Sequence, residues 1–160
     1  MNPGVRFRLV NCAFATFKKP LDPEAVDAEI RRLAKEVFLD VLPVTRTGDG
    51  KWWTILHPKF EGIGCSVSIQ TKKRLRFHRA SGDESAGWVQ HVCQHNLAKK
   101  FNGQCSDEGV LAPWSPGHNT TPTWREYFQM VFGHLPEMAE DLWKRQVAQL
   151  PDDLRTLAEK

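Results

Sequence analysis

The spacing of apolar residues changes near Pro43, and this change constrains the fold more than any other feature of the sequence. Between residues 22 and 41, apolar residues recur every three or four positions, as on one face of an α-helix. Residues 51–57 and 65–79 instead alternate between apolar and polar side chains, which is typical of half-buried β-strands. A chain with both patterns must pack helix on sheet, so we expect an α+β fold.

Capping and turn residues predict the order of the elements. Asp22 and Pro23 suit the N-cap and the first position of a helix. A strand is expected earlier, over residues 5–17, with a bulge near Asn11, and a second helix over residues 85–101. The predicted order is β-α-β-β-β-α, an antiparallel or mixed sheet of about four strands with helices on one face and a helical C-terminal extension.

We expect a single domain over residues 1–160, because this length can bury a core without cross-links. Its parts would be a basic α+β core (1–103), a long loop (104–122) and an acidic helical extension (123–160). Residues 1–103 carry 17 Lys and Arg against 10 Asp and Glu, whereas the remainder carries 5 against 9. No apolar run suits a signal peptide or a membrane span, so we expect a cytoplasmic protein without a membrane partner.

Residues 71–79, TKKRLRFHR, contain the clearest candidate for a binding surface. If Leu75 and Phe77 face the helices, the charged side chains between them must face away. The same alternation in the first predicted strand would add two more arginines to this outer face. The predicted partner-binding residues are Arg6, Arg8, Lys72, Lys73, Arg74, Arg76, His78, one of Trp52 and Trp53, and Trp114 in the long loop.

Such a face would combine arginines with an exposed aromatic ring and would contain no acid. This combination suits an acidic protein surface or a nucleic acid, although a solvated sheet face is the simpler interpretation. The absence of acids favours binding. We therefore expect a non-catalytic protein-binding module that docks on an acidic surface, for example an immunity-type inhibitor of a toxin or nuclease.

Nucleic-acid binding through the same face is the alternative. Helix, three strands and helix over about residues 22–101 resembles the element order of double-stranded RNA-binding domains. In that family the second helix begins with lysines that contact phosphates, whereas here it begins ESAGWVQH, and Lys99 and Lys100 lie at its far end. The net charge of +3 is also modest for a dedicated nucleic-acid binder.

Two patterns suggest chemistry. His91 and His95 share a helical face, as zinc ligands can, but a helical wheel places both on the solvent side, with Cys93 in the core and no third ligand. We therefore predict no metal site and no cofactor. An enzyme with a site in the 104–122 loop, at Cys105 and His118, is the second alternative, which the neighbouring acids oppose because they raise a thiol pKa.

Overall fold

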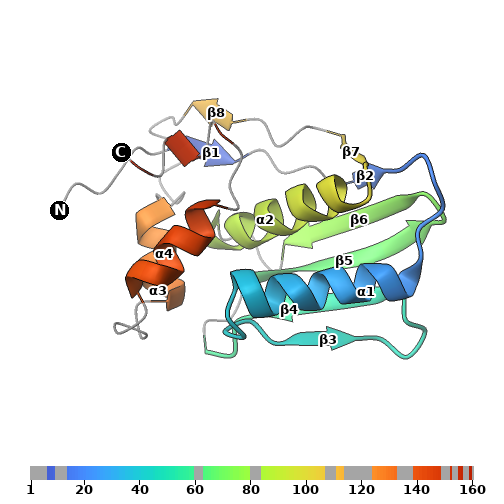
Figure 1. Ribbon diagram of the computed structural model, residues 1–160, viewed down its shortest axis with the longest axis horizontal. Helices are drawn as coiled ribbons and strands as arrows, with labels where there is room; N and C mark the ends of the chain where they lie inside the picture. The colour runs from blue at the N-terminus through green and yellow to red at the C-terminus, as the bar shows by residue number, and fades with distance from the viewer. Residues whose placement is uncertain are drawn as a thin grey trace.

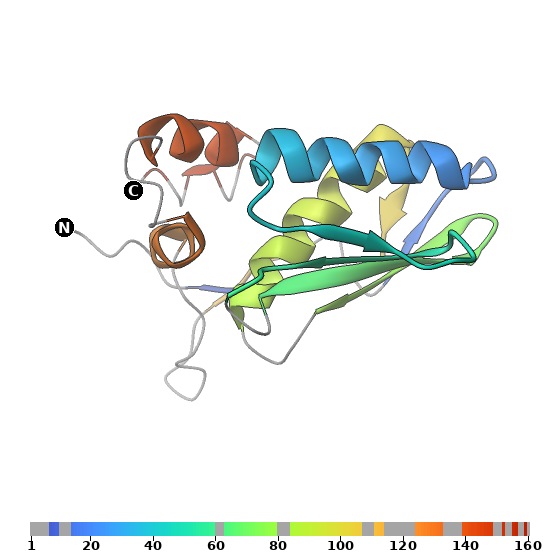
Figure 2. The same cartoon turned by 90° about the horizontal axis from the view of Figure 1, so that it is seen from below.

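The computed structural model describes residues 7–9, 14–59, 63–79, 84–106, 111–113, 124–132, 139–148, 152, 155, 156 and 159. Two helices, α1 and α2, lie on one face of a six-stranded sheet, and α3 and α4 lie at one end of these layers (Figures 1 and 2). The α+β class expected from the sequence is confirmed, with more strands than the four predicted.

The main sheet is antiparallel throughout, in the spatial order β3-β4-β5-β6-β2-β7. Its strands are β2 (Phe14–Thr16), β3 (Val44–Arg46), β4 (Trp52–Leu56), β5 (Gly64–Thr71), β6 (Arg74–Arg79) and β7 (Gln104–Cys105). A separate two-stranded ribbon pairs β1 (Phe7–Leu9) with β8 (Leu111–Pro113).

The prediction of one strand over residues 5–17 is wrong, because the described part of this segment forms two strands in different sheets. Only β2 joins the main sheet, beside β6, while β1 pairs with β8. Four strands, not three, separate α1 from α2, so the resemblance in order to double-stranded RNA-binding domains does not hold. The strands β3, β7 and β8 span two or three residues each, too few to produce a recognisable period.

Helix α1 (Pro23–Arg32) continues into a short π-helical segment, η1 (Leu33–Val37). The predicted N-cap is confirmed, since the Asp22 side chain accepts a hydrogen bond of 3.1 Å from the backbone N–H of Glu24. The helix ends before Pro43, because Leu39 and Asp40 adopt positive φ angles of 47° and 61°. Its buried apolar stripe consists of Val26, Ile30, Leu33 and Val37.

One buried contact fixes α1 to the sheet. The indole Nε1 of Trp53, in β4, donates a hydrogen bond of 2.9 Å to Oδ1 of Asp27. The Arg46 guanidinium lies 5.2 Å from the centre of the Trp53 ring and forms an ion pair of 2.9 Å with Glu24. Burial raises the pKa of Asp27, but hydrogen bonds from Trp53 and Arg31 and the charges of Arg31 and Arg46 outweigh it, so that this pKa is lowered.

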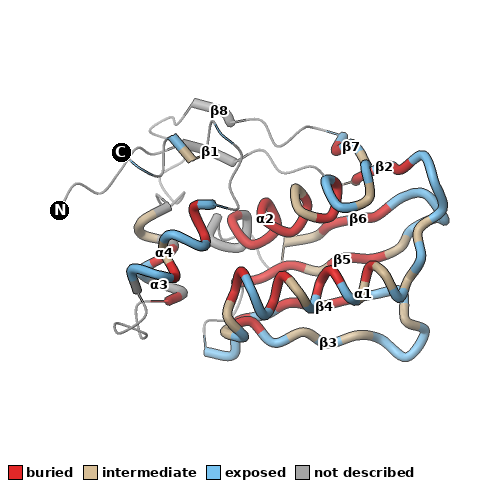
Figure 3. Tube along the Cα trace, in the orientation of Figure 1, coloured by how far each residue is buried: buried red, intermediate tan, exposed pale blue. Residues whose placement is uncertain are grey.

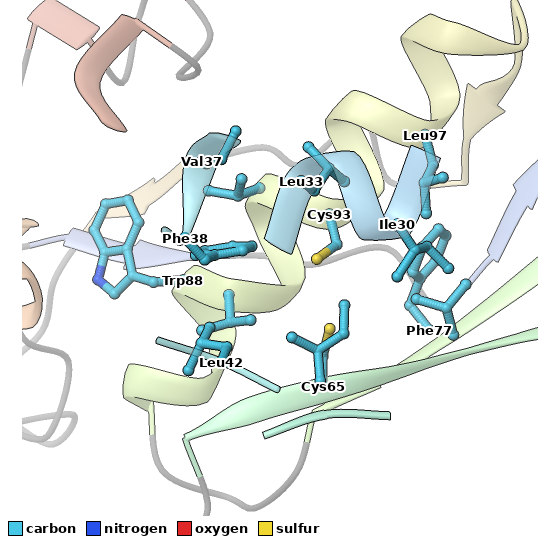
Figure 4. Packing of buried hydrophobic residues seen from close by; sticks show 14 of the residues in the cluster. Ile30, Leu33, Val37, Phe38, Leu42, Cys65, Phe77, Trp88, Cys93 and Leu97 are labelled. Atoms are coloured by element: carbon cyan, nitrogen blue, oxygen red, sulfur yellow. The ribbon is translucent and has the colours of Figure 1, made fainter. Parts of the chain in front are cut away.

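Helix α2 (Glu84–Lys100) contacts β5 and β6 on one side and α1, α3 and β1 on others. Figure 4 shows Trp88, Cys93 and Leu97 of this helix packed among side chains of α1, η1 and the sheet. Because α2 is enclosed in this way, burial extends around most of its circumference over residues 88–94 (Figure 3). Its low amphipathicity follows from this position.

The end of α2 agrees with the predicted end to within one residue. Asn102 adopts a positive φ of 54°, and the N–H of Gly103 donates a hydrogen bond of 2.7 Å to the carbonyl of Ala98. A Cβ atom on Gly103 would lie 2.2 Å from the Phe17 ring. Packing against Phe17 therefore requires glycine at this position.

The C-terminal helices are α3 (Trp124–Phe132) and α4 (Ala139–Ala148), in the region where helices are predicted. The rings of Phe128 and Trp143 meet edge to face, with centroids 5.1 Å apart, while Phe132 and Leu142 are fully buried. Among the helices described, none has the length and apolar character needed to cross a membrane.

The contact between Asp27 and Trp53 leads to a stability prediction. Asp27→Ala leaves the buried Trp53 N–H without its acceptor, and we expect a loss of roughly 1–3 kcal/mol in the free energy of unfolding. Asp27→Asn keeps an acceptor oxygen and should lose less. Urea unfolding at neutral pH measures both, with Asp141→Ala as a surface control that changes by less than about 0.5 kcal/mol. Equal losses for Asp27→Ala and Asp141→Ala would contradict this role.

Candidate functional site

The face of the main sheet opposite α1 and α2 is the candidate site, and we call it the open face. In Figure 2 both helices lie on the other side of the sheet, and no described helix or strand lies over this one. The strand residues that alternate with the buried ones provide its side chains. They are Phe14, Thr16, Thr45, Trp52, Thr54, Leu56, Ser66, Ser68, Arg74, Arg76, His78 and Gln104.

The cations of the open face come from β6. Leu75 and Phe77 are buried toward the helices, so Arg74, Arg76 and His78 lie on the opposite side, as the alternation predicts. The two arginines are exposed and His78 is half-buried. Their orientation agrees with the sequence, whereas their role in binding stays a prediction.

Phe14, in β2, holds the two arginines close together. It lies directly opposite Arg76 in the register, and Thr16 lies opposite Arg74. The guanidinium carbons of Arg74 and Arg76 lie 5.2 Å and 5.8 Å from the centre of the Phe14 ring. Both distances suit cation–π attraction, which restrains the two side chains without neutralising them. Two positive charges are thus held at one place on the sheet.

A second aromatic contact on the open face joins β4 to β6 across β5. Trp52, in β4, stacks on His78, in β6, with ring centroids 5.9 Å apart and planes inclined by 14°. The intervening strand, β5, presents only Ser66 and Ser68 between them. Strands β4 and β6 are roughly 10 Å apart, twice the spacing of neighbouring strands, so only small side chains on β5 allow these rings to meet. Trp52 nevertheless keeps 41% of its surface exposed.

His78 is predominantly neutral at neutral pH. Partial burial lowers the pKa of His78 below its ordinary value, and the positive charge of Arg76 lowers it further. The neutral imidazole can stack on Trp52 without adding to the repulsion between the arginines. The permanent charge of the strand residues on the open face therefore comes from Arg74 and Arg76.

Carboxylates are absent from the described side chains of the open face. In the described parts of the chain, Arg74 and Arg76 take part in no ion pair; the paired carboxylates lie on helices. The pairs are Arg31–Asp27, Arg32–Glu29, Arg32–Glu36, Arg46–Glu24, Arg46–Asp27, Lys144–Glu140, Arg145–Asp141 and Arg155–Asp152. The described carboxylates that form ion pairs thus lie away from the open face, and its arginines keep their positive charge.

Several predicted site residues do not lie together. Arg8 lies in β1, outside the main sheet, so it does not extend the row of Arg74 and Arg76 as predicted. Of the two adjacent tryptophans, Trp52 is exposed on the open face and Trp53 is buried. Lys72 and Lys73 are exposed in the turn between β5 and β6. Arg6 and Trp114 lie outside the described residues.

Two large apolar residues of the open face, Phe14 and Leu56, are missing from the sequence prediction. Phe14 reaches this face because β2 pairs with β6 and places Phe14 opposite Arg76. Phe14 and Thr16 alternate with the buried Ala15, but this pattern predicts the outward position of Phe14 only if the boundaries of β2 are already known. Leu56 is 41% exposed. Among the described residues, Leu56 and Trp52 are the two large apolar side chains that are exposed.

The prediction that His91 and His95 lie on a solvent-exposed side of α2 is wrong. His91 is fully buried and His95 half-buried, with ring centroids 4.3 Å apart. The helical wheel assumed a helix with one wet side, whereas α2 is enclosed by other elements. Within the described residues, no group of three or more His, Cys, Asp or Glu side chains could hold a metal ion.

The described cysteines occupy the core. Cys65, Cys93 and Cys105 are not in disulfides and have little or no exposed surface. A hydrogen bond with Cys65, and then burial, raise the pKa of the Cys93 thiol well above its ordinary value, and Figure 4 shows the two sulfurs facing each other. Cys105, the predicted nucleophile, lies in β7 opposite Ala15; its predicted partner, His118, lies outside the described residues.

Comparison with known proteins gives no relative: no family model, no curated protein and no solved structure matches this chain. The geometry of the open face is thus the basis for an argument about function.

The buried His91 predicts how stability depends on pH. Burial, and then the charge of His95, lower the pKa of His91 to about 3, from 6.5 in the unfolded chain. Above pH 6.5 His91 is neutral in both the folded and the unfolded chain, and the folded state has its full stability. As the pH falls from 6.5 toward 3, His91 gains a proton in the unfolded chain but not in the folded one, so the free energy of unfolding decreases. Between about pH 7 and pH 5 the unfolding free energy should fall by about 2 kcal/mol from this group alone.

The comparison of wild type with His91→Gln or His91→Asn in urea, at three pH values over this range, measures this contribution. The variants should lose this part of the pH dependence, whereas His78→Gln, at a more exposed site, should keep most of it. If the unfolding free energy falls equally with pH in wild type and in both His91 variants, His91 does not control the pH dependence of stability.

Proposed function

We propose that this protein is a non-catalytic binding module whose open face docks on an acidic surface of a partner protein. The observation that supports this most directly is the pair of guanidinium groups held over Phe14 on a face without described carboxylates. A partner carboxylate can accept two parallel hydrogen bonds from one guanidinium, so the arginines provide orientation as well as charge. Neutralisation of a toxin or nuclease is one form of such docking.

The apolar part of the face favours a protein partner. Trp52 and Leu56, both in β4 and both 41% exposed, lie on the same face as Arg76. Tryptophan and arginine are the residues most enriched where a few side chains dominate the binding energy between proteins. Stacking of nucleic-acid bases has less support here, because His78 already covers part of Trp52 and the two arginines contact Phe14.

Reversal of the two charges tests the proposal. Arg74→Glu with Arg76→Glu places two carboxylates where a partner's carboxylates would lie, and we expect capture of the partner to be abolished. Both side chains are exposed and outside the core, so the melting temperature should change little. Affinity purification from the source cells, with quantitative mass spectrometry, compares the two proteins.

A double variant with the same change of charge, Lys35→Glu with Lys59→Glu, is the control, since both lysines are exposed and neither lies on the open face. The specific partner should have an acidic surface, remain bound after nuclease treatment and be retained by the control. Identical sets of captured proteins for wild type and the Arg74/Arg76 variant would refute the proposal, as would loss of the partner on nuclease treatment.

Trp52 is expected to be the apolar anchor of the same interface. Trp52→Ala removes a large, partly exposed ring, and we expect binding to the captured partner to weaken by at least about 2 kcal/mol, the size of a hot-spot residue. Binding measured by calorimetry gives this value, and Lys35→Ala, at an exposed position of η1 away from the open face, is the control. A loss no greater than that of the control would show that charge alone drives docking.

A further inference from the structure

Three lysine pairs from distant parts of the sequence meet at one end of the molecule, which we call the lysine end. They are Lys18–Lys19 after β2, Lys72–Lys73 in the turn between β5 and β6, and Lys99–Lys100 at the end of α2. Figures 1 and 2 show the segment between β2 and α1 beside the β5–β6 turn.

Backbone hydrogen bonds and a ring contact hold these segments together. The N–H of Phe17 donates a hydrogen bond of 2.9 Å to the carbonyl of Lys73, and the N–H of Leu21 donates one of 2.7 Å to that of Lys72. On the other side, the Phe17 ring contacts Phe101, just after α2, with centroids 6.4 Å apart. The three pairs thus belong to one rigid end of the fold.

The charge of the lysine end is not neutralised within the described part of the chain. All six lysines are exposed, and none forms an ion pair with a described carboxylate. The acids nearest to Lys18 and Lys19 along the chain have other partners: Asp22 caps α1, and Glu24 pairs with Arg46. Lys99 and Lys100 also offset the negative end of the α2 dipole, so an anion can approach there.

A polar hollow lies beside Lys18 and the residues that follow Lys99–Lys100 in the chain. It has a volume of about 420 Å³ and is lined by Thr16, Phe17, Lys18, Asn102, Gly103 and Gln104. The exposed hydroxyl and amide side chains of Thr16, Asn102 and Gln104 supply hydrogen-bond donors beside the ammonium groups. Such donors suit phosphate and sugar oxygens, which accept most protein hydrogen bonds to nucleic acids.

We propose that the lysine end binds the phosphate backbone of single-stranded nucleic acid, with a sugar–phosphate unit in the hollow. The two large apolar side chains exposed among the described residues, Trp52 and Leu56, both lie on β4, so the lysine end lacks the anchor that a protein interface uses. Lysine ammonium groups are hydrated point charges, and release of counterions from a polyphosphate gives affinity without apolar contact.

A single strand fits this surface better than a duplex. The lysines come from two loops and a helix C-terminus around a hollow, and a flexible backbone can follow that path. The helix end at this place is the N-terminus of α1, and it carries the acids Asp22 and Glu24, so it does not suit entry into the groove of a duplex. This proposal goes beyond docking through the open face and does not depend on it.

Fluorescence anisotropy with a labelled oligothymidylate of about 20 nucleotides tests the proposal on the full chain. If four to six phosphates are neutralised, the logarithm of affinity should fall with that of salt concentration with a slope of about −3 to −4. Between about 50 and 200 mM salt, binding should weaken roughly 50- to 300-fold. Lys18→Gln with Lys72→Gln and Lys73→Gln should weaken binding roughly tenfold or more and reduce the slope by about 2.

The control removes the same charge elsewhere, by Lys35→Gln with Lys59→Gln and Lys144→Gln, three exposed positions. This triple variant should bind like wild type, and circular dichroism checks that both variants are folded. Three results would each overturn the proposal: no binding at about 50 mM salt, equal weakening by both triple variants, or equal affinity for a duplex. Displacement of the oligonucleotide by poly-glutamate at equal charge would also overturn it, in favour of an acidic polypeptide. Because Arg74 and Arg76 are unchanged, none of these results decides the docking of a protein on the open face.

Discussion

The hydrogen bond between Trp53 and Asp27 is the constraint on which the open face depends. Trp53 is buried between β4 and α1, and its N–H finds an acceptor only if that side of β4 faces the helix. Because side chains alternate along a strand, a shift of one residue would exchange Trp53 with Trp52 and reverse the whole strand. The buried contact thereby places Trp52, Thr54 and Leu56 on the open face.

Two features define the open face: the small side chains of its central strand and the arginines that form no ion pair with a described carboxylate. Ser66 and Ser68 on the central strand allow Trp52 and His78 to stack across it, and Phe14 holds two guanidinium groups beside it. The described acids that pair with arginine or lysine lie on helices, where the ion pairs stabilise local structure by modest amounts. A surplus of positive charge is consequently displayed on the open face and continues at the lysine end.

Much of the fold could be predicted where elements are long and periodic. Helix α1 with its cap at Asp22, strands β4 to β6 and helix α2 agree with the sequence because each shows several turns or alternations. The short strands and the division of residues 5–17 into β1 and β2 could not be predicted, since three residues carry no period. His91 was placed wrongly for another reason: the packing of α1, α3 and β1 around α2 leaves no trace in the pattern of α2 itself.

The sequence alone determined which side of β6 carries charge, because an alternation of Leu75 and Phe77 with Arg74, Arg76 and His78 has only one way to bury its apolar residues. It also determined the α+β class, through the change of hydrophobic period near Pro43. Only the tertiary structure decided that Phe14, and not an arginine of β1, lies beside those charges, and that three lysine pairs converge at one end. Strand pairing and loop contacts join residues that are distant in sequence, and their energies depend on packing that no local pattern records.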